Sequence, residues 1–308
     1  MATPSELVAL ARELGAAVEG QPENVPDVLP RLAEILASET ESQVVTETVI
    51  ALGQAWDQQA VELILNHVRV DHPNGDVRLA VAGALPNGVE DDSPCRDTVI
   101  ESLITLSRDE SSDVRDWACF GLGQVEASSP AAQDALAARI ADSDDDTRCE
   151  ALLALAKTGD PRANPALQRL IRGSKNLSRL EVQAAAELAD PELHPLLVRV
   201  SQDWAGDDDE FTPVLAFAIS RCRLEAKAQA LLVERELVAR VNTLLAEQGL
   251  TVTAVGNYPR TALTFHSTQN PTPPAVLDSI WPNEDPWEYP LEQIAQSFVS
   301  SHVNGNQE

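Results

Sequence analysis

Three stretches of the sequence share one pattern: Asp76-Val-Arg78 before LAVAGAL, Asp113-Val-Arg115 before DWACFGLG, and Asp146-Thr-Arg148 before CEALLALA. Weaker copies flank them, with Val45 in the arginine position of the copy before Arg78, and Arg179 in that of the copy after Arg148. The pattern thus recurs every 31–37 residues or so, and a repeat of roughly this length is typical of a pair of helices. The sequence therefore predicts helix pairs stacked into a solenoid.

Capping and helix-breaking residues mark the partner helix of each pair. Asp and Ser side chains accept hydrogen bonds from the free amides of a first helical turn, and proline loses no bond at the first helical position. Aromatic residues make up only 4% of the chain, which favours closely packed helices over a sandwich or barrel. We therefore expect an all-α fold. The predicted helix starts are Asp57, Ser93-Pro94, Ser129-Pro130, Asp160-Pro161 and Asp190-Pro191.

The pattern D-x-R-x-x-A-x-x-A-L-G, followed by a D-P helix start, resembles the HEAT repeats of the phycobilin-lyase subtype. The segments DVRDWACFGLG and DTRCEALLALAKTGDPRANPALQRL carry the resemblance most fully. It implies a HEAT-like α-solenoid over residues 1–248, with its clearest repeats in residues 42–200. It also implies that the Asp and Arg of the pattern are structural and bond from repeat to repeat along the stack. These ladder residues are Asp76, Arg78, Asp113, Arg115, Asp146 and Arg148.

Residues 249–308 differ in character from the repeats, because they hold half of the aromatic residues and many prolines. Alternating LTVTAV and TALTFH runs on either side of GNYPR predict a β-hairpin, and the stretch from Pro271 to Pro290 is too rich in proline for a helix. An uncovered last repeat would expose an apolar face. We therefore expect this C-terminal segment to cap the solenoid or to dock onto a partner. Its aromatic residues are Tyr258, Phe265, Trp281, Trp287, Tyr289 and Phe298.

The charge balance bounds the choice of partner. The chain has 49 acidic and 22 basic residues, giving a net charge of -27. Such a surface repels nucleic acid and anionic lipid and attracts basic proteins. The expected partner is therefore a basic protein, with no direct nucleic-acid or membrane contact.

Cysteine usage and the N-terminus favour a cytoplasmic protein, and the excess of Arg over Lys suggests a bacterial source. Cys95, Cys119, Cys149 and Cys222 lie far apart and form no CxxC, which is typical of reduced, apolar side chains. The opening MATPSELVALARELG lacks the basic and long apolar runs of a secretion signal. No segment reaches the length of an apolar membrane span.

Helical spacing separates core from surface in the second helix of each repeat. Counting from the arginine position as zero, apolar residues recur at offsets 3, 6 and 7, as in Val81, Ala84 and Leu85, and these are predicted core. Offsets 1, 2 and 5 fall on another face, which the HEAT resemblance implies is concave. Trp117 and Phe120 would form an aromatic anchor there, although Trp117 could instead pack against the neighbouring repeat. The predicted partner-binding residues are Glu47, Ile50, Leu79, Asp116, Trp117, Phe120, Glu150, Leu153 and Glu181.

Acidic loops form a second candidate surface. They occur at Asp109-Glu110, in residues 142–146 and in residues 207–210, each at a turn between the two helices of a repeat. Stacking would place them along one edge as an acidic rim that recruits a basic partner. The alternative interpretation is helix capping together with solubility. The predicted rim residues are Asp142, Asp144, Asp145, Asp207, Asp208 and Asp209.

Signatures of catalysis are missing from the sequence, so no catalytic, cofactor or metal site is predicted. It contains no glycine-rich phosphate loop, HExxH or GxSxG motif. His67, Asp71 and His72 are interpreted as a solvated turn, and the acidic runs lack calcium-loop spacing. HEAT-like DNA glycosylases need a positive concave face, and deoxyhypusine hydroxylase carries His-Glu pairs, neither of which this sequence offers.

The leading functional hypothesis is a non-enzymatic module that binds a basic protein through a concave, acidic and aromatic surface. Its sharpest version is an immunity or inhibitor protein that occludes the substrate groove of a basic toxin by charge mimicry. One alternative is a scaffold or assembly subunit that docks through its C-terminal segment. Another alternative is a lyase-like enzyme of the HEAT-repeat class.

Overall fold

The computed structural model describes residues 2–38, 40–173, 177–203, 211–246, 250–255, 262–267 and 276–279. The chain divides into two compact units, Met1–Ala184 and Ala185–Glu308. The division falls inside helix α11 (Arg179–Leu188). The predicted boundary at residue 248 lies within the second unit and stays a prediction.

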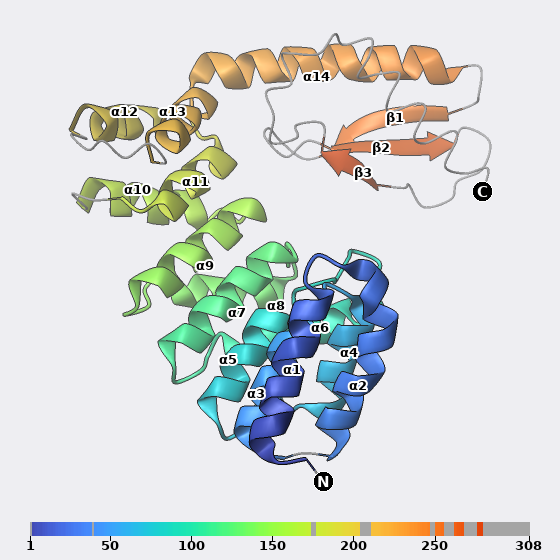
Figure 1. Cartoon of the computed structure of the whole chain (residues 1–308). Coiled ribbons are helices and arrows are strands. Elements are labelled where there is room, and N and C mark those ends of the chain that lie inside the picture. The colour runs from blue at the N-terminus through green and yellow to red at the C-terminus, as the bar shows by residue number, and fades with distance from the viewer. Residues whose placement is uncertain are drawn as a thin grey trace. The chain divides into compact units, whose positions relative to one another are not determined.

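The first unit consists of two layers of helices, coloured from blue to green in Figure 1. One layer is formed by α1 (Pro4–Val18), α3 (Ser42–Gly53), α5 (Gly75–Ala84), α7 (Ser112–Gln124) and α9 (Asp145–Lys157). The other contains α2 (Val25–Ser38), α4 (Gln58–His67), α6 (Arg96–Leu106), α8 (Pro130–Arg139) and α10 (Ala163–Gly173), with a short turn η1 (Pro22–Asn24) before α2. Successive odd-numbered helices pack side by side, and each even-numbered helix packs on an odd-numbered neighbour. The prediction of an all-α solenoid is confirmed.

The core follows the predicted helical spacing. Val81, Ala84 and Leu85 of the α5 repeat are at most 3% exposed, and the same offsets are buried in α7 and α9. Burying a Val or Leu side chain contributes about 1.5–3 kcal/mol, which stabilises the stack.

The register of the last predicted repeat was wrong by three residues. Asn74, Ser111 and Asp144 are the helix N-caps, each four residues before the arginine position. In α11 the backbone of Ser178 accepts from Val182 as those caps accept from their arginines, so Val182 holds the position assigned to Arg179. The corrected spacing from Arg148 to Val182 falls between the two spacings that separate Arg78, Arg115 and Arg148. The misassignment arose because Arg179 was the nearest arginine in a repeat that has none at this position.

Small residues set the spacing within the odd-numbered layer. A Cβ on Gly53 would lie 2.9 Å from Ala84 Cβ, and a Cβ on Gly123 would lie 3.0 Å from Ala154 Cβ. The Gly stands at offset 8 and the Ala at offset 6 of the next helix, which explains the A-L-G of the repeat pattern. Between α5 and α7 offset 8 is Pro86, and offset 6 is Gly121, whose Cβ would lie 3.3 Å from Pro86 Cγ. The small residue has moved to the other helix, so close packing is kept.

The predicted capping residues start their helices in two different ways. Asp57 accepts from two amides of α4, and Ser129 accepts from Ala132 in α8, as predicted. Asp160 and Asp190 instead accept from the amide two residues later, forming a turn before α10 and before α12 (His194–Asp203). Ser93 also lies in a turn before α6. Proline after Asp or Ser therefore marks the approach to these helices and not always their first residue.

The second unit contains helices and a small sheet. The helices are α12, α13 (Phe211–Arg221) and α14 (Leu224–Leu245), and the strands are β1 (Leu250–Val255), β2 (Ala262–Ser267) and β3 (Val276–Ser279). β1 and β2 pair antiparallel with Val252 opposite Phe265, so the predicted hairpin is confirmed. β3 extends the sheet and was not predicted. The side-chain amide of Asn242 bonds both backbone groups of Val252, which joins α14 to β1.

Candidate partner-binding groove

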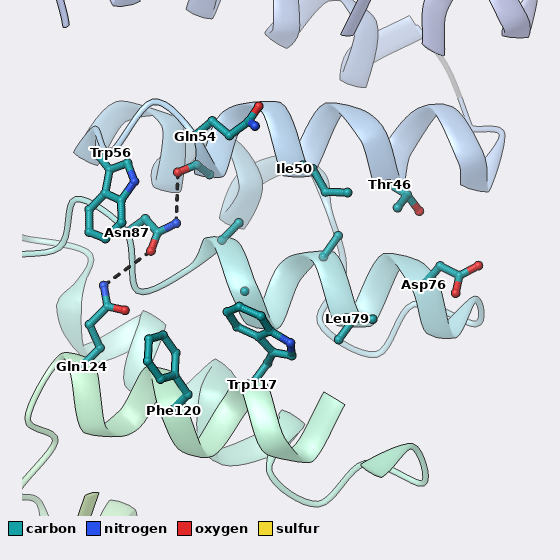
Figure 2. Close-up of a pocket in the computed structure, with 14 residues that line it drawn as sticks. Thr46, Ile50, Gln54, Trp56, Asp76, Leu79, Asn87, Trp117, Phe120 and Gln124 are labelled. Atoms are coloured by element: carbon teal, nitrogen blue, oxygen red, sulfur yellow. Dashed lines mark hydrogen bonds between the residues drawn. The ribbon is translucent and has the colours of Figure 1, made fainter. Parts of the chain in front are cut away.

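A groove of about 750 Å³ crosses α3, α5 and α7 in the first unit (Figure 2). Its apolar side chains are Ile50, Trp56, Leu79, Trp117 and Phe120. Trp117 and Phe120 meet edge to face, with ring centroids 5.5 Å apart. Trp56, Trp117 and Phe120 are 64%, 44% and 38% exposed, which is unusual for such large apolar side chains. Trp117 does pack against a neighbouring repeat, over Gly83 of α5, but it stays 44% exposed.

The groove exists because α5 carries small residues where its neighbours carry large ones. At offset 5 Gly83 stands between Ile50 of α3 and Phe120 of α7. At offset 2 Ala80 corresponds to Trp117. Trp117 lies over α5, because a Cβ on Gly83 would be 3.5 Å from Trp117 Cε3. Trp117 and Phe120 of α7 thus form one wall of the groove, the aromatic wall. The opposite wall is α3, and the floor is α5.

Amide side chains close one end of the groove. Asn87 Nδ2 donates to the carbonyl oxygen of Gly53 at 3.0 Å, and Gln124 Nε2 donates to Asn87 Oδ1 at 3.4 Å (Figure 2). These bonds join the C-terminal ends of α3, α5 and α7, while Asp76 and Thr46 lie at the other end. The groove therefore has an apolar middle between polar ends.

Trp56 lies at the amide end and was not singled out in the sequence. Its φ of 47° is left-handed, a conformation that glycine adopts freely and most other residues avoid. At the same offset, 11, α7 is followed by Glu126 with φ 43° and α9 by Gly159 with φ 69°. A comparison of the helix ends would have found Trp56, because it is a large apolar residue at a position that a glutamate and a glycine occupy in later repeats.

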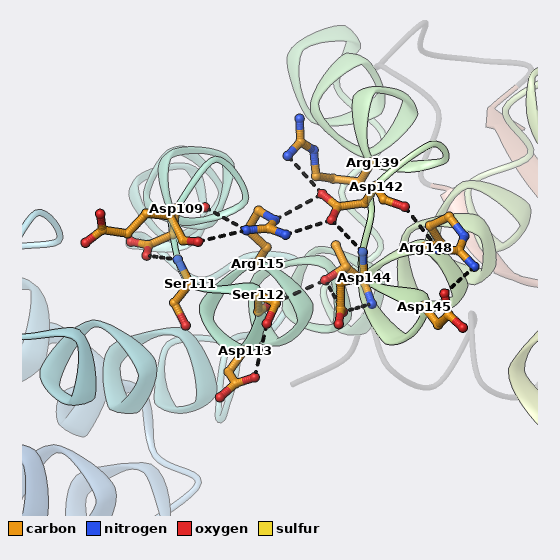
Figure 3. A network of polar contacts seen from close by, with 12 residues as sticks. Asp109, Ser111, Ser112, Asp113, Arg115, Arg139, Asp142, Asp144, Asp145 and Arg148 are labelled. Carbon is orange, nitrogen blue, oxygen red and sulfur yellow. Dashed lines mark hydrogen bonds and ion pairs between the residues drawn. The ribbon is translucent and has the colours of Figure 1, made fainter.

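An arginine–aspartate ladder supports the repeats that carry the groove (Figure 3). Arg78 donates to Asp109 at 2.6 and 3.0 Å, and Arg115 donates to Asp142 at 3.0 and 2.7 Å. The arginines also donate to carbonyl oxygens of the loops before their own helices. Each guanidinium thus joins its own loop to the loop of the next repeat.

The predicted ladder was right about two arginines and wrong about the aspartates. Arg78 and Arg115 bond to the next repeat, whereas Arg148 pairs at 2.6 Å with Asp145 in its own first turn. The carboxylates come from Asp109 and Asp142, six residues before an arginine position. The aspartates of the repeat pattern lie only two residues before the arginine position. They are in the first helical turn, where they face solvent and the positive end of the helix. These exposed aspartates are Asp76, Asp113 and Asp146.

The predicted acidic rim is divided by the structure. Asp142, whose side chain is 5% exposed, bonds Arg115 and Arg139 and belongs to the ladder. Asp144 caps α9 by accepting from Thr147, so the capping interpretation holds for it. The side chain of Asp145 is 84% exposed. Asp207, Asp208 and Asp209 lie outside the described residues.

Two predicted partner-binding residues are buried. Glu181, 6% exposed, accepts from the backbone amide of Ser178 at 2.6 Å in a capping box of α11. With Val182 as zero its offset is -1, which is also the offset of the fully buried Val77, so the register error explains this misplacement. Leu153 is 8% exposed and packs in the core. Glu47 is partly buried and forms an ion pair with Arg12 of α1.

Asp116 and Glu150 are half-buried on adjacent helices. Asp116 precedes Trp117 on α7, and Glu150 takes on α9 the position that Trp117 takes on α7. Burial, followed by the charges of Asp146, Asp144 and Asp113, raises the pKa of Asp116 to about 6. Burial and then the charge of Asp116 raise the pKa of Glu150 to about 7, partly offset by Lys157. Both carboxylates are therefore held where their charged forms are disfavoured.

Neither the histidines nor the helices of the described residues form a metal or membrane site. Among the described residues, no three His, Cys, Asp or Glu side chains gather as they would around a metal ion. His67 bonds the Leu63 carbonyl within α4, and His72 accepts from the Asn74 amide, so the two rings serve local turns. No helix in the described part of the chain is long and apolar enough to cross a bilayer.

The stacked helix pairs and their ladder define an α-helical repeat solenoid. Residues 100–189 match the family model of HEAT repeats, so this stretch consists of HEAT repeats. The crystal structure of YibA from Escherichia coli is similar at 20% identity, covering 71% of this chain and 81% of that chain with a TM-score of 0.51. That likeness supports the solenoid fold.

Two further structures are similar at lower TM-scores. Computationally designed armadillo repeat proteins for modular peptide recognition align at 17% identity and a TM-score of 0.45, over 60% of this chain and 92% of theirs. The CpcE–CpcF complex of phycocyanin lyase from Nostoc sp. PCC7120 aligns at 12% identity and a TM-score of 0.44, over 72% of this chain and 95% of that chain. A search of curated proteins finds no sequence that matches the chain.

Proposed function

We propose that this protein is a non-enzymatic binding module that holds a basic protein partner in the groove across α3, α5 and α7. The observation that carries the proposal is the exposure of Trp56, Trp117 and Phe120 in one groove. Large aromatic side chains in water are costly, and they are enriched where a partner covers them. The volume of the groove, about 750 Å³, gives room for side chains of a partner.

Charge supports a basic partner. The chain carries a net charge of -27, so its field accelerates encounter with a positively charged protein. Asp116 stands next to the aromatic wall, and Asp76 lies at one end of the groove. The partner would therefore meet an apolar anchor surrounded by acidic groups.

We propose further that the basic partner is a nucleic-acid-handling protein. Such proteins present basic surfaces to phosphates, and an acidic solenoid with an aromatic anchor can occupy the same surface. The chain would then act as an immunity or inhibitor protein. The four cysteines are free and buried, which supports a reducing compartment such as the bacterial cytoplasm.

Site-specific photocrosslinking tests this function. A photoreactive phenylalanine analogue replaces Ile50 or Phe120 in the groove, and Glu101 on the exposed side of α6 serves as the matched control. We expect the two groove positions, and not Glu101, to crosslink one Lys- and Arg-rich protein in the producing cells. The purified pair should weaken as salt rises. Equal crosslinking from Glu101, or a partner without excess positive charge, would contradict the proposal.

A further inference from the structure

Asp116 and Glu150 differ from three other inward-facing carboxylates of the solenoid, Asp109, Asp142 and Asp160. Asp109, Asp142 and Asp160 each pair with an arginine at 2.6 to 2.7 Å. For Asp116 and Glu150, in contrast, the described part of the chain provides no ion pair within 4.0 Å. Two carboxylates on neighbouring helices are thus left without a counter-charge in a solenoid that supplies one elsewhere.

One oxygen of this pair is also without a hydrogen bond. Asp116 Oδ1 is shielded from solvent and accepts from no donor among the described residues. Leaving a buried acceptor unpaired costs about 1–3 kcal/mol, and more for a charged group. The donor that satisfies such an atom comes from outside the chain, from water or from a ligand.

The neighbours of the pair have the wrong sign to relieve it. Asp113 lies on α7 with Asp116, and Asp144 and Asp146 lie at the start of α9. Among the described residues Lys157 is the one cation that acts on Glu150, and it lies two turns away along α9. The local field is therefore negative, as a cation-binding site requires.

The aromatic wall is within reach of the same pair. Asp116 is adjacent to Trp117 in the chain, and neighbouring packed helices lie about 8–10 Å apart. A Lys or Arg side chain can span that distance with its aliphatic stem on the aromatic rings and its charged head at the carboxylates. Apolar contact and charge thus point to the same kind of side chain.

We propose that Asp116 and Glu150 form the subsite for one basic side chain of the partner, whose stem packs on Trp117 and Phe120, and that its binding expels protons from the two carboxyl groups. This inference rests on the proposed function and names the chemistry of the anchoring residue. Around neutral pH roughly half of Glu150 is protonated when the subsite is empty, because burial raises its pKa to about 7. A bound cation favours the ionised forms of both residues and lowers both pKa values.

The sign of the pH dependence follows from linkage. The empty subsite holds protons on these carboxyls that the occupied subsite does not, so rising pH favours occupation. For each unit by which the bound cation lowers the pKa of a carboxyl group, the affinity at high pH exceeds that at low pH by about tenfold. The affinity for a cationic ligand should therefore increase at least about tenfold from pH 5 to pH 8, a range that brackets the pKa values of about 6 and about 7.

Two peptides that differ in one charge test the subsite in the full chain. They are acetyl-Gly-Leu-Arg-Leu-Gly-amide and the same peptide with citrulline, the neutral isostere, in place of arginine. Binding is followed by NMR at the indole N–H of Trp117, assigned by its loss in Trp117→Phe. The variant is the double substitution Asp116→Asn with Glu150→Gln. Its control is Asp97→Asn with Glu101→Gln, which removes two exposed charges from α6.

The arginine peptide should bind more tightly than the citrulline peptide at pH 8, and this advantage should shrink at least about tenfold at pH 5. The double variant should lose both the advantage and its pH dependence, whereas the control should keep them. Removing buried like charges does not threaten folding, and circular dichroism verifies it. Equal binding of the two peptides, or an arginine advantage that persists in the double variant, overturns the subsite but leaves the groove as a binding site. If neither peptide shifts Trp117, both the subsite and the proposed groove are overturned.

Discussion

The indole ring of Trp117 lies over Gly83, the residue with no side chain in the floor of the groove. A Cβ on Gly83 would be in ordinary contact with this ring, 3.5 Å from Cε3. The aromatic wall and the bare helix surface are thus parts of one arrangement, in which α5 leaves room and α7 frames it.

Gly83 therefore offers a graded test of the groove. Gly83→Ala should stabilise the protein by about 0.5–1 kcal/mol, because glycine is costly inside a helix and the methyl group fits. Gly83→Leu should fill the space beside Trp117 and weaken partner binding at least about tenfold, equivalent to roughly 1.4 kcal/mol. Urea denaturation and titration with the crosslinked partner measure the two effects. Unchanged affinity in Gly83→Leu would place the partner elsewhere.

Replacing Gly123 by alanine should have the opposite effect on stability to Gly83→Ala. Its Cβ would come within 3.0 Å of Ala154 Cβ, so Gly123→Ala forces α7 and α9 apart. We expect a loss of about 1–3 kcal/mol despite the better helix propensity of alanine. Comparing the urea midpoints of Gly123→Ala and Gly83→Ala isolates packing from propensity. A stabilised Gly123→Ala would show that the two helices are not closely packed at this point.

Asp142 should contribute more to stability than any exposed aspartate of the repeat pattern. Asp142→Ala leaves Arg115, with 12% of its side chain exposed, without its counter-charge and should cost about 3 kcal/mol. Asp113→Ala removes an exposed charge and should change stability by less than about 0.5 kcal/mol. Chemical denaturation of both variants tests this contrast. Equal losses would contradict the assignment of the ladder.

The stability of the free protein should rise as pH falls from 8 to 5. The native state holds protons on Asp116 and Glu150, whose pKa values are about 6 and about 7, while the unfolded chain does not hold them until lower pH. The gain should be on the order of 1–3 kcal/mol, and Asp116→Asn with Glu150→Gln should flatten it.

Below about pH 4 this trend should reverse. The hydrogen bond from Arg115 lowers the pKa of Asp142. Burial raises the pKa of Asp109, but the hydrogen bonds from Arg78 and from the Ser111 amide, together with the charges of Arg78 and Arg115, lower it overall. Their stabilising effect is lost as pH falls through these lowered values. Thermal unfolding measured from pH 8 to below pH 4 follows both the rise and the later fall of stability. A flat profile in the wild-type chain would contradict the raised pKa values.

Trp56 should be retained for binding at the expense of stability. Trp56→Gly relieves the left-handed strain and should stabilise the chain by about 1 kcal/mol, since the side chain is 64% exposed and loses little packing. The same substitution should weaken the partner complex, because it removes an aromatic contact from the groove. Destabilisation by Trp56→Gly would indicate that the indole ring has a packing role.

The sequence predicted best where periodicity directly reports burial. Offsets 3, 6 and 7 identified Val81 and its equivalents, and the side-by-side placement of Trp117 and Phe120 followed from helical spacing. The fold class followed because the repeat length and caps agreed with each other.

Features that depend on contacts between repeats were harder to predict. The partner of Arg78 is 31 residues away at Asp109, in a loop whose acidic residues equally suggested a solvated rim. The register of Glu181 failed because its repeat lacks the arginine that marked the others. The groove itself depends on Gly83, which has no side chain. The sequence does not show that this leaves a groove, because the large side chains beside it come from other repeats.

The outer repeats have Val45 and Val182 in the arginine position, and the ladder consists of the bonds from Arg78 to Asp109 and from Arg115 to Asp142. It therefore locks together the consecutive repeats that carry the aromatic wall and the floor of the groove. A surface held in place in this way is preorganised: docking does not have to order it first, and little of the interaction energy is lost as entropy. The ladder has no contact with the groove, yet it would lower the entropic cost of every complex formed there.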